Sequence, residues 1–201
     1  MTKRLVLASN NPKKAAEMTA LLAPLGIEVL PQSAFGIAEA EEPHDTFVEN
    51  ALAKARHAAR CAGLPAVADD SGLCVAALGG APGVQSARFA GEPKSDARNN
   101  ALLIERLERL AGVDDRRAFF YSAVVLVRRA DDPRPLIADG EWHGTILDAP
   151  RGDAGFGYDP LFYVPELGRT AAELDALTKN SLSHRGKAMG ELLARLSADP
   201  L

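Results

Sequence analysis

The chain has 201 residues, of which 47% are hydrophobic and 25% are charged, a composition that excludes a disordered or collagen-like protein. Its length predicts one domain, and no apolar run approaches the roughly 18 residues of a membrane span. The net charge of −4 and the 5% aromatic content argue against a nucleic-acid-binding protein, which needs a basic surface or a stacking platform. Cys61 and Cys74 lie in apolar segments without metal-ligand spacing, so we expect two reduced core thiols in a cytoplasmic protein.

The first part of the chain alternates short apolar runs with helical periods, which indicates an α/β fold. We expect strands over residues 5–8 and 27–30, and between them a helix that begins near Pro12 and buries Met18, Leu21, Leu22 and Leu25. Thr46 and Glu49 have the spacing of a capping box, which predicts a helix that runs to about Cys61 and stops at Gly63. Residues 65–69 and 73–77 predict two further strands.

The second part of the chain is richer in predicted strands. Ser95 predicts the start of a helix that carries Leu103, Leu107 and Leu110 on one face. Residues 119–127 predict a strand and residues 136–147 a returning strand or a hairpin, on either side of a turn at 131–133. Thr170 and Glu173 form a second capping box, and Ser183 predicts the start of a last helix with an apolar stripe of Met189, Leu192, Leu193 and Leu196. These elements predict one α/β domain with two lobes and a cleft.

A polar segment follows the first predicted strand and leads into the first predicted helix. It consists of Ser9, Asn10, Asn11, Pro12, Lys13 and Lys14. A helix N-terminus presents unpaired N–H groups and a partial positive charge, so it is a natural phosphate site, and the lysines add charge. The alternative is simple N-capping with exposed lysines. The segment lacks the glycine and Lys-Ser/Thr pattern of a P-loop.

Two acidic segments are candidates for metal binding or catalysis. Glu39, Glu41 and Glu42 precede the helix at Thr46 and are either a solvated loop or hard oxygen ligands for Mg²⁺. Asp69 and Asp70 come at the carboxyl end of a predicted strand, where α/β proteins bind ligands, although Asp-Ser-Gly is also a common turn.

Two further segments, near the carboxyl end of the chain, suit recognition of a flat ring. Phe156 lies between two glycines and is followed by Tyr158 and Asp159, which suits stacking, although a turn with core aromatics has the same pattern. His184 and Arg185 come at a predicted helix start, where cations oppose the helix dipole and a bound group would offset that cost. A histidine near a helix cap is otherwise most often structural.

Taken in order, these segments resemble the inosine/xanthosine triphosphate pyrophosphatase family over nearly the whole chain. The resemblance is carried by Ser9-x-Asn11-x-x-Lys14-x-x-Glu17, Thr46-Phe47-x-Glu49-Asn50-Ala51 with Lys54-Ala55, Ala68-Asp69-Asp70-Ser71-Gly72-Leu73, Gly79-Gly80-Ala81-Pro82-Gly83, Ser86-Ala87-Arg88, Gly155-Phe156-Gly157-Tyr158-Asp159-Pro160 and Ser183-His184-Arg185-Gly186. The chain departs from the family's pattern at Ser9, where Thr is commoner, and at Asn10, where Gly is common. A serine keeps the hydroxyl group, so only the geometry of this loop is affected.

The resemblance implies a two-lobed α/β fold with a long mixed central sheet flanked by helices, an active cleft between the lobes, and a homodimer. It implies Mg²⁺-dependent hydrolysis of ITP, dITP and XTP to the monophosphate and pyrophosphate. Asp70 matches the proton acceptor, and Glu41 and Asp70 match metal-linked acids. Residues 9–14 match the phosphate-proximal loop, and Lys54 would add a second cation near the phosphates. The other substrate positions implied are Ser71, Phe156, Gly157, Tyr158, Asp159, Lys179, His184 and Arg185.

Two other functions stay open at this stage. One is a pyrophosphatase for another modified nucleotide, such as a modified pyrimidine, because Phe156 would stack on either base. The other is a nucleotide sensor without catalysis. Asp69, Asp70 and Glu41 count against a sensor, since binding a polyanion does not by itself need carboxylates.

Overall fold

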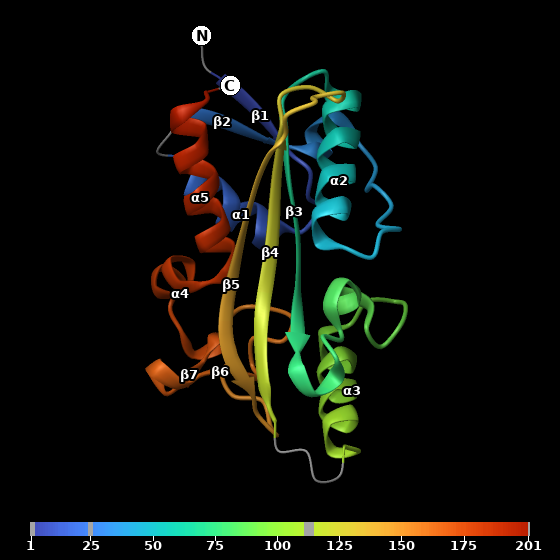
Figure 1. The fold of residues 1–201 in the computed structure, drawn as a ribbon, viewed down its shortest axis with the longest axis vertical. Helices are drawn as coiled ribbons and strands as arrows, with labels where there is room; N and C mark the ends of the chain where they lie inside the picture. Colours follow the sequence, from blue (N-terminus) through green and yellow to red (C-terminus); the bar gives the residue numbers. More distant parts are fainter. Residues whose placement is uncertain (1–2, 24–25, 111–114, 201) are drawn as a thin grey trace. The chain divides into compact units, whose positions relative to one another are not determined.

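The computed structural model describes residues 3–23, 26–110 and 115–200 (Figure 1). Its strands are β1 (Lys3–Leu7), β2 (Ile27–Pro31), β3 (Ala66–Val75), β4 (Arg117–Val127), β5 (Leu136–Ile146), β6 (Phe162–Val164) and β7 (Arg169–Thr170). Its α-helices are α1 (Pro12–Leu22), α2 (Phe47–Ala62), α3 (Asp96–Glu108), α4 (Ala176–Leu182) and α5 (His184–Ala198). The side chains of Lys13, Lys14 and Glu17, and the whole of Leu25, lie outside the described part of the structure.

The strands form one seven-stranded sheet in the order β2-β1-β3-β4-β5-β6-β7. β1 pairs in parallel with β2 and β3, whereas β6 pairs antiparallel with β5 and β7. The register aligns Leu7 of β1 with Val67 of β3. The sheet is therefore mixed, and with its helices it confirms the predicted α/β fold.

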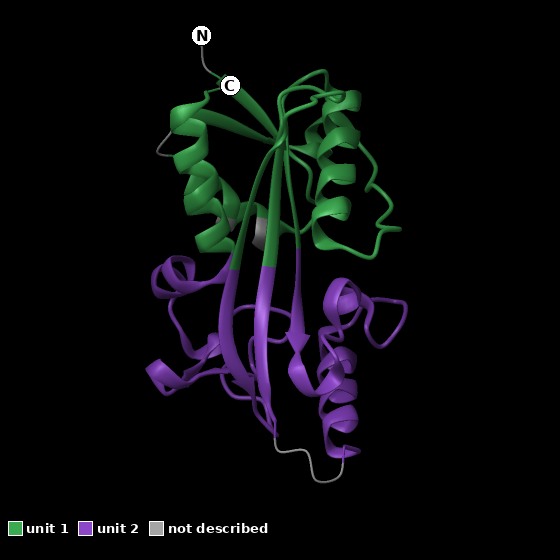
Figure 2. Cartoon of the chain, in the orientation of Figure 1, with its two compact units in different colours: residues 1–70, 122–140, 185–201 green, residues 71–121, 141–184 purple. Residues whose placement is uncertain are grey.

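The chain divides into two compact units, coloured separately in Figure 2. Unit 1 comprises residues 1–70, 122–140 and 185–201, and unit 2 comprises residues 71–121 and 141–184. In unit 1, α1 and α5 bury Met18 and Met189 against strand residues that include Leu5, Leu7 and Val67. In unit 2, the core gathers α3 and strand side chains, and it includes Leu103, Leu107, Trp142, Phe162 and Leu161. Each unit thus has a core of its own.

The helix boundaries follow the local signals in the sequence. The Thr46 hydroxyl accepts the Glu49 N–H at 3.3 Å and begins α2, and Gly63 ends it with a φ of 65°. The Ser95 hydroxyl accepts the Arg98 N–H at 3.3 Å and begins α3. These caps confirm the predicted starts of both helices, because a cap depends on neighbouring residues alone.

The prediction of two strands around Asp69 and Asp70 is wrong. Residues 66–75 form one continuous strand, β3, and the acidic pair lies within it rather than at its end. The apparent Ser71-Gly72 turn stays extended because it lies inside β3, which is hydrogen-bonded to β4 in the sheet, whereas β1 pairs with β3 only at Ala66 and Val67. Tertiary pairing here overrides the local preference for a turn.

The short strands β6 and β7 and the short α-helix α4 of unit 2 were not predicted. β6 has three residues, β7 has two and α4 has seven, so none is long enough to display a clear hydrophobic period. α4 is capped by Asp175, whose carboxylate accepts the Thr178 N–H at 2.9 Å. Ser183 is the single residue between α4 and α5, so the last helix begins where the sequence predicts.

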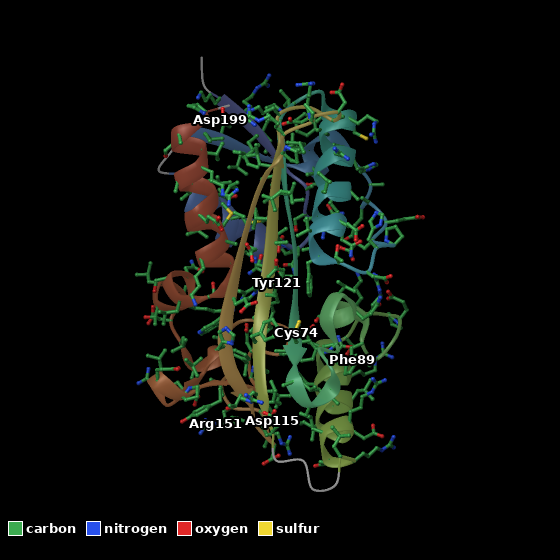
Figure 3. The ribbon with its side chains drawn as sticks, in the orientation of Figure 1. Cys74, Phe89, Asp115, Tyr121, Arg151 and Asp199 are labelled. Carbon is green, nitrogen blue, oxygen red and sulfur yellow. The ribbon has the colours of Figure 1, made fainter. Side chains whose placement is uncertain are left out.

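The two cysteines differ in their environment, although both are free thiols. Cys74 is buried on β3, as predicted (Figure 3). The prediction that Cys61 is also a core thiol is wrong, since Cys61 is exposed. Burial along α2 ends at Ala59, and Arg60 and Cys61 in the last turn of the helix are exposed. Within the described residues, no helix has the length and apolar character needed to cross a membrane.

Candidate functional site

The first candidate segment is the loop that leaves the sheet after β1 in unit 1. The Ala8 N–H donates to the Val67 carbonyl at 2.9 Å, after which β1 ends while β3 continues through Asp69 and Asp70. The Ser9 hydroxyl accepts the Asn11 N–H at 3.2 Å, and α1 begins at Pro12. Asn10 is exposed. A helix N-terminus therefore follows a loop that departs next to the two carboxylates, which is a suitable place for a phosphate.

Asp69 and Asp70 point to opposite faces of β3, because successive side chains of a strand alternate. Asp70 accepts a hydrogen bond from Lys54 of α2 at 2.9 Å. Asp69 instead pairs with Arg185 of α5, whose Nε lies 3.4 Å from Oδ2. Figure 1 shows α2 and α5 on opposite sides of β3. The two neighbouring acids therefore contact different parts of unit 1.

Lys54 is the centre of the site on the α2 face. Its Nζ lies 2.8 Å from Glu42 Oε1 and 2.9 Å from Asp70 Oδ1. Burial lowers the pKa of Lys54, but the charges of Asp70, Asp69 and Glu42 outweigh it and raise that pKa above its usual value. Lys54 therefore carries its positive charge at neutral pH. Asn50, one turn earlier on α2, donates to the second Asp70 oxygen at 3.5 Å.

The acidic loop before α2 contributes Glu42 to this cluster, a residue that the sequence did not single out from its neighbours. Glu41, the expected metal-linked acid, is exposed. Among the described residues, no group of three or more His, Cys, Asp or Glu side chains is arranged to hold a metal ion. Mg²⁺ usually takes only one or two protein carboxylates and completes its shell with phosphate and water oxygens. The carboxylates of Glu42 and Asp70, brought together by Lys54, fit such a partial ligand set.

The aromatic loop of unit 2 is held from within by Asp159. One oxygen of this buried carboxylate accepts the Phe156 N–H at 2.8 Å and pairs with Lys179 Nζ at 2.7 Å. Lys179 Nζ also lies 5.1 Å from the centre of the Phe156 ring, within the range of a cation–π contact. Gly155 has a φ of 77°, and a Cβ there would lie 2.9 Å from Asp159 Cγ. Only glycine fits this position.

Helix α3 holds the next peptide of the same loop, which the sequence did not indicate. The Asp96 carboxylate accepts the Gly157 N–H at 2.7 Å, and the Asn100 side chain donates to the Gly157 carbonyl at 2.9 Å. The Tyr158 hydroxyl donates to the Ser86 carbonyl at 2.8 Å. Burial, and then the charge of Asp96, raise the pKa of Tyr158, so the hydroxyl remains a protonated donor. These contacts fix the backbone that follows Phe156.

The Ser183–Arg185 segment is buried, and its residues His184 and Arg185 belong to different units. His184 is in unit 2, where its ring stacks on Phe120 at 4.9 Å with 16° between the planes. Arg185 is in unit 1 and is 3% exposed. Ser71, in unit 2, directly follows Asp70 along β3.

Two groups of predicted residues are thus each held together by contacts within one unit. Lys54 with Asp70 is in unit 1, and Phe156, Asp159 and Lys179 are in unit 2. The first set combines an oriented carboxylate with a fixed cation, and the second combines an aromatic ring with a charged side chain over it. Of the acids in the loop before α2, Glu42 is the one that bonds Lys54, and Glu41 is exposed.

The comparisons with known proteins identify the family of the chain. The model of the Ham1 family matches residues 5–195, which is most of the chain. The chain belongs to the Ham1 family. A relative from Aromatoleum aromaticum, named dITP/XTP pyrophosphatase, is 83% identical over 201 residues and covers 100% of both chains. A relative from Ralstonia nicotianae with the same name is 64% identical over 197 residues and covers 96% of both chains.

Solved structures of the Ham1 family share the fold. A HAM1 protein from Coxiella burnetii superposes with a TM-score of 0.92 at 51% identity, covering 98% of this chain and 99% of that one. The Staphylococcus aureus Ham1 protein superposes with a TM-score of 0.86 at 39% identity, covering 98% of this chain and 100% of that one. The predicted resemblance to a family of nucleotide pyrophosphatases is confirmed.

Proposed function

We propose that this Ham1 family chain hydrolyses the deaminated purine nucleotides ITP, dITP and XTP to the nucleoside monophosphate and pyrophosphate. The observation that carries the proposal is the buried Asp70 carboxylate, held by Lys54 and Asn50 next to the loop that leads into α1. The relatives named dITP/XTP pyrophosphatase, the first at 83% identity, support the choice of substrate.

The unit 1 residues supply what cleavage between the α and β phosphorus atoms requires. The reaction needs the phosphate charge neutralised, a water oriented for attack and the leaving pyrophosphate stabilised. Asp70 accepts the proton from the attacking water, and its contacts with Lys54 and Asn50 orient the carboxylate. Ser9, Asn10, Asn11 and the α1 N-terminus at Pro12 bind the phosphates, and Lys13, Lys14 and Lys54 offset their charge.

We also propose Mg²⁺ as the cofactor. Glu42 and Asp70 would hold it, with Glu41 as a further acid of the same loop. When bound, the ion neutralises phosphate charge and polarises the phosphoryl oxygens. If Mg²⁺ binds there, Lys54 keeps Glu42 and Asp70 close together before the substrate arrives.

By the family resemblance, the unit 2 residues and Arg185 recognise the base. Phe156 stacks on the ring, and Gly157, Tyr158 and Asp159 shape the loop that presents it. Lys179, His184 and Arg185 are donors, and Ser71 contributes a hydroxyl. Hypoxanthine and xanthine carry a 6-keto oxygen that accepts from Arg185, whereas adenine presents an amino group there, so two donors meet. This contact does not reject guanine, which also has the 6-keto oxygen.

One assay separates the proposal from its rivals. The protein is incubated with ITP, XTP, GTP and ATP at one Mg²⁺ concentration and with a chelator, and early products are separated by chromatography. We expect pyrophosphate and monophosphate from ITP and XTP, and loss of activity with the chelator. Binding without any pyrophosphate release would indicate a sensor, and accumulation of a diphosphate would show that the terminal phosphate is cleaved instead. A preference for a modified pyrimidine would favour the other pyrophosphatase function.

The proposal includes the assembly and the location. The resemblance to the pyrophosphatase family supports a homodimer, which light scattering on the purified protein would test directly. The substrates are free nucleotides rather than nucleic acid or lipid, which supports a cytoplasmic enzyme without a nucleic-acid or membrane partner. Fractionation of cells that express a tagged chain would test this location.

A further inference from the structure

Asp69 lies on the face of β3 that α5 covers, away from the Asp70 cluster. Val67, two residues earlier on the same face, belongs to the core that contains Ala188, Met189 and Leu192 of α5. Asp70 lies on the other face with Lys54 and Asn50 of α2. The two carboxylates that adjoin in sequence are therefore separated by the strand itself.

Asp69 and Arg185 form a deeply buried ion pair. The side chain of Asp69 is 1% exposed and that of Arg185 is 4% exposed, with Nε and Oδ2 3.4 Å apart. Arg185 is the second residue of α5, whose first turn contains no acidic residue. Both burial and the positive end of the helix dipole disfavour a guanidinium there. The negative charge of the Asp69 carboxylate, on β3, offsets both effects.

We infer that Asp69 is a positioning residue that orients Arg185 for recognition of the base and does not itself accept the proton of the attacking water. The contact through Nε holds one edge of the planar guanidinium. A small displacement of a recognition group is enough to lose much of its effect. This inference rests on the proposed function, because it names how Arg185 of that same site is held.

The test is a double-mutant cycle with Asp69→Asn and Arg185→Gln, measured on ITP and ATP. We expect Asp69→Asn to raise KM for ITP about tenfold or more, to change kcat by less than about threefold, and to lower the ITP/ATP selectivity in kcat/KM. In the Arg185→Gln background, Asp69→Asn should cause less than about a twofold further change, because its effect passes through Arg185. Asp70→Asn is the matched control and should lower kcat for every nucleotide at unchanged selectivity.

Three results would overturn the assignment of Asp69. One is a loss of kcat in Asp69→Asn like that of Asp70→Asn, and another is a further large loss in the Arg185→Gln background. The third is an ITP/ATP selectivity that neither single variant changes. If Asp69→Asn does not fold alone, the double variant keeps the test readable, because it leaves no buried charge without its partner. A wild-type protein that releases no pyrophosphate from ITP would instead refute the proposed function.

Discussion

Replacing Gly155 by alanine tests whether Asp159 sets the shape of the aromatic loop. Gly155 has a φ of 77°, and a Cβ would lie 2.9 Å from Asp159 Cγ and closer still to its Oδ2. Gly157, two residues on, has a φ of 63° and no atom within 4 Å of a built Cβ. Gly157→Ala is therefore a matched control that shares the backbone strain but not the collision.

The two variants are expected to differ by about 3 kcal/mol in the free energy of unfolding. A left-handed alanine costs about 1–2 kcal/mol at either position, partly offset by its lower entropy in the unfolded chain. At Gly155 the carboxylate of Asp159 must also move, which weakens its bonds to the Phe156 N–H and to Lys179. Hydrogen bonds to charged groups are worth about 1.5–3 kcal/mol each, and partial loss of two gives the expected difference.

Urea unfolding and steady-state kinetics on ITP measure the two consequences. At a slope of about 2–3 kcal/mol per molar urea, Gly155→Ala should unfold about 1–1.5 M earlier than Gly157→Ala. Its KM for ITP should also rise about tenfold, since Phe156 loses its fixed position. Equal unfolding midpoints for the two variants would refute the role given to Asp159.

Three further outcomes are expected. Asp70→Asn should lower kcat at least about a hundredfold, the lower range for a general base, while circular dichroism shows an intact fold; near-wild-type turnover would remove Asp70 from the mechanism. The wild type should prefer ITP and XTP over ATP by about 10²–10⁴ in kcat/KM, because adenine leaves buried donors unpaired, and equal values for ITP and ATP would exclude recognition of the keto oxygen. Burial, and then the charge of Glu141, raise the pKa of Cys74 to about 11, so at pH 8 only about one in a thousand of these thiols is ionised. Brief iodoacetamide treatment, followed by mass spectrometry, should therefore show that the exposed Cys61 is modified first. The labelling rate of Cys74 should rise about tenfold per pH unit up to about pH 11. Equal labelling of both cysteines at pH 8 would contradict this prediction.

Local physics determined the parts of this protein that the sequence predicted correctly. Thr46 and Ser95 begin helices because a side-chain oxygen caps N–H groups two or three residues away. The apolar stripe of α5 is buried because its spacing places Met189, Leu192 and Leu196 on one side of the helix. The residue types in the motifs suit parts of a nucleoside triphosphate, but it was the resemblance of the motifs, taken in order, to a known family that indicated nucleotide chemistry.

Tertiary structure alone decided which of these residues act together. Asp69 and Asp70 read as one acidic pair at a strand end, but β3 runs on past the end of β1, and its pleat directs them to Arg185 and Lys54. Glu42 rather than Glu41 meets Lys54, and Asp96 with Asn100 holds Gly157 from 61 and 57 residues away in the chain. A sequence window contains neither the strand that pairs with a segment nor the helix that covers it, so it predicts the residue types of a site but not the partners that orient them.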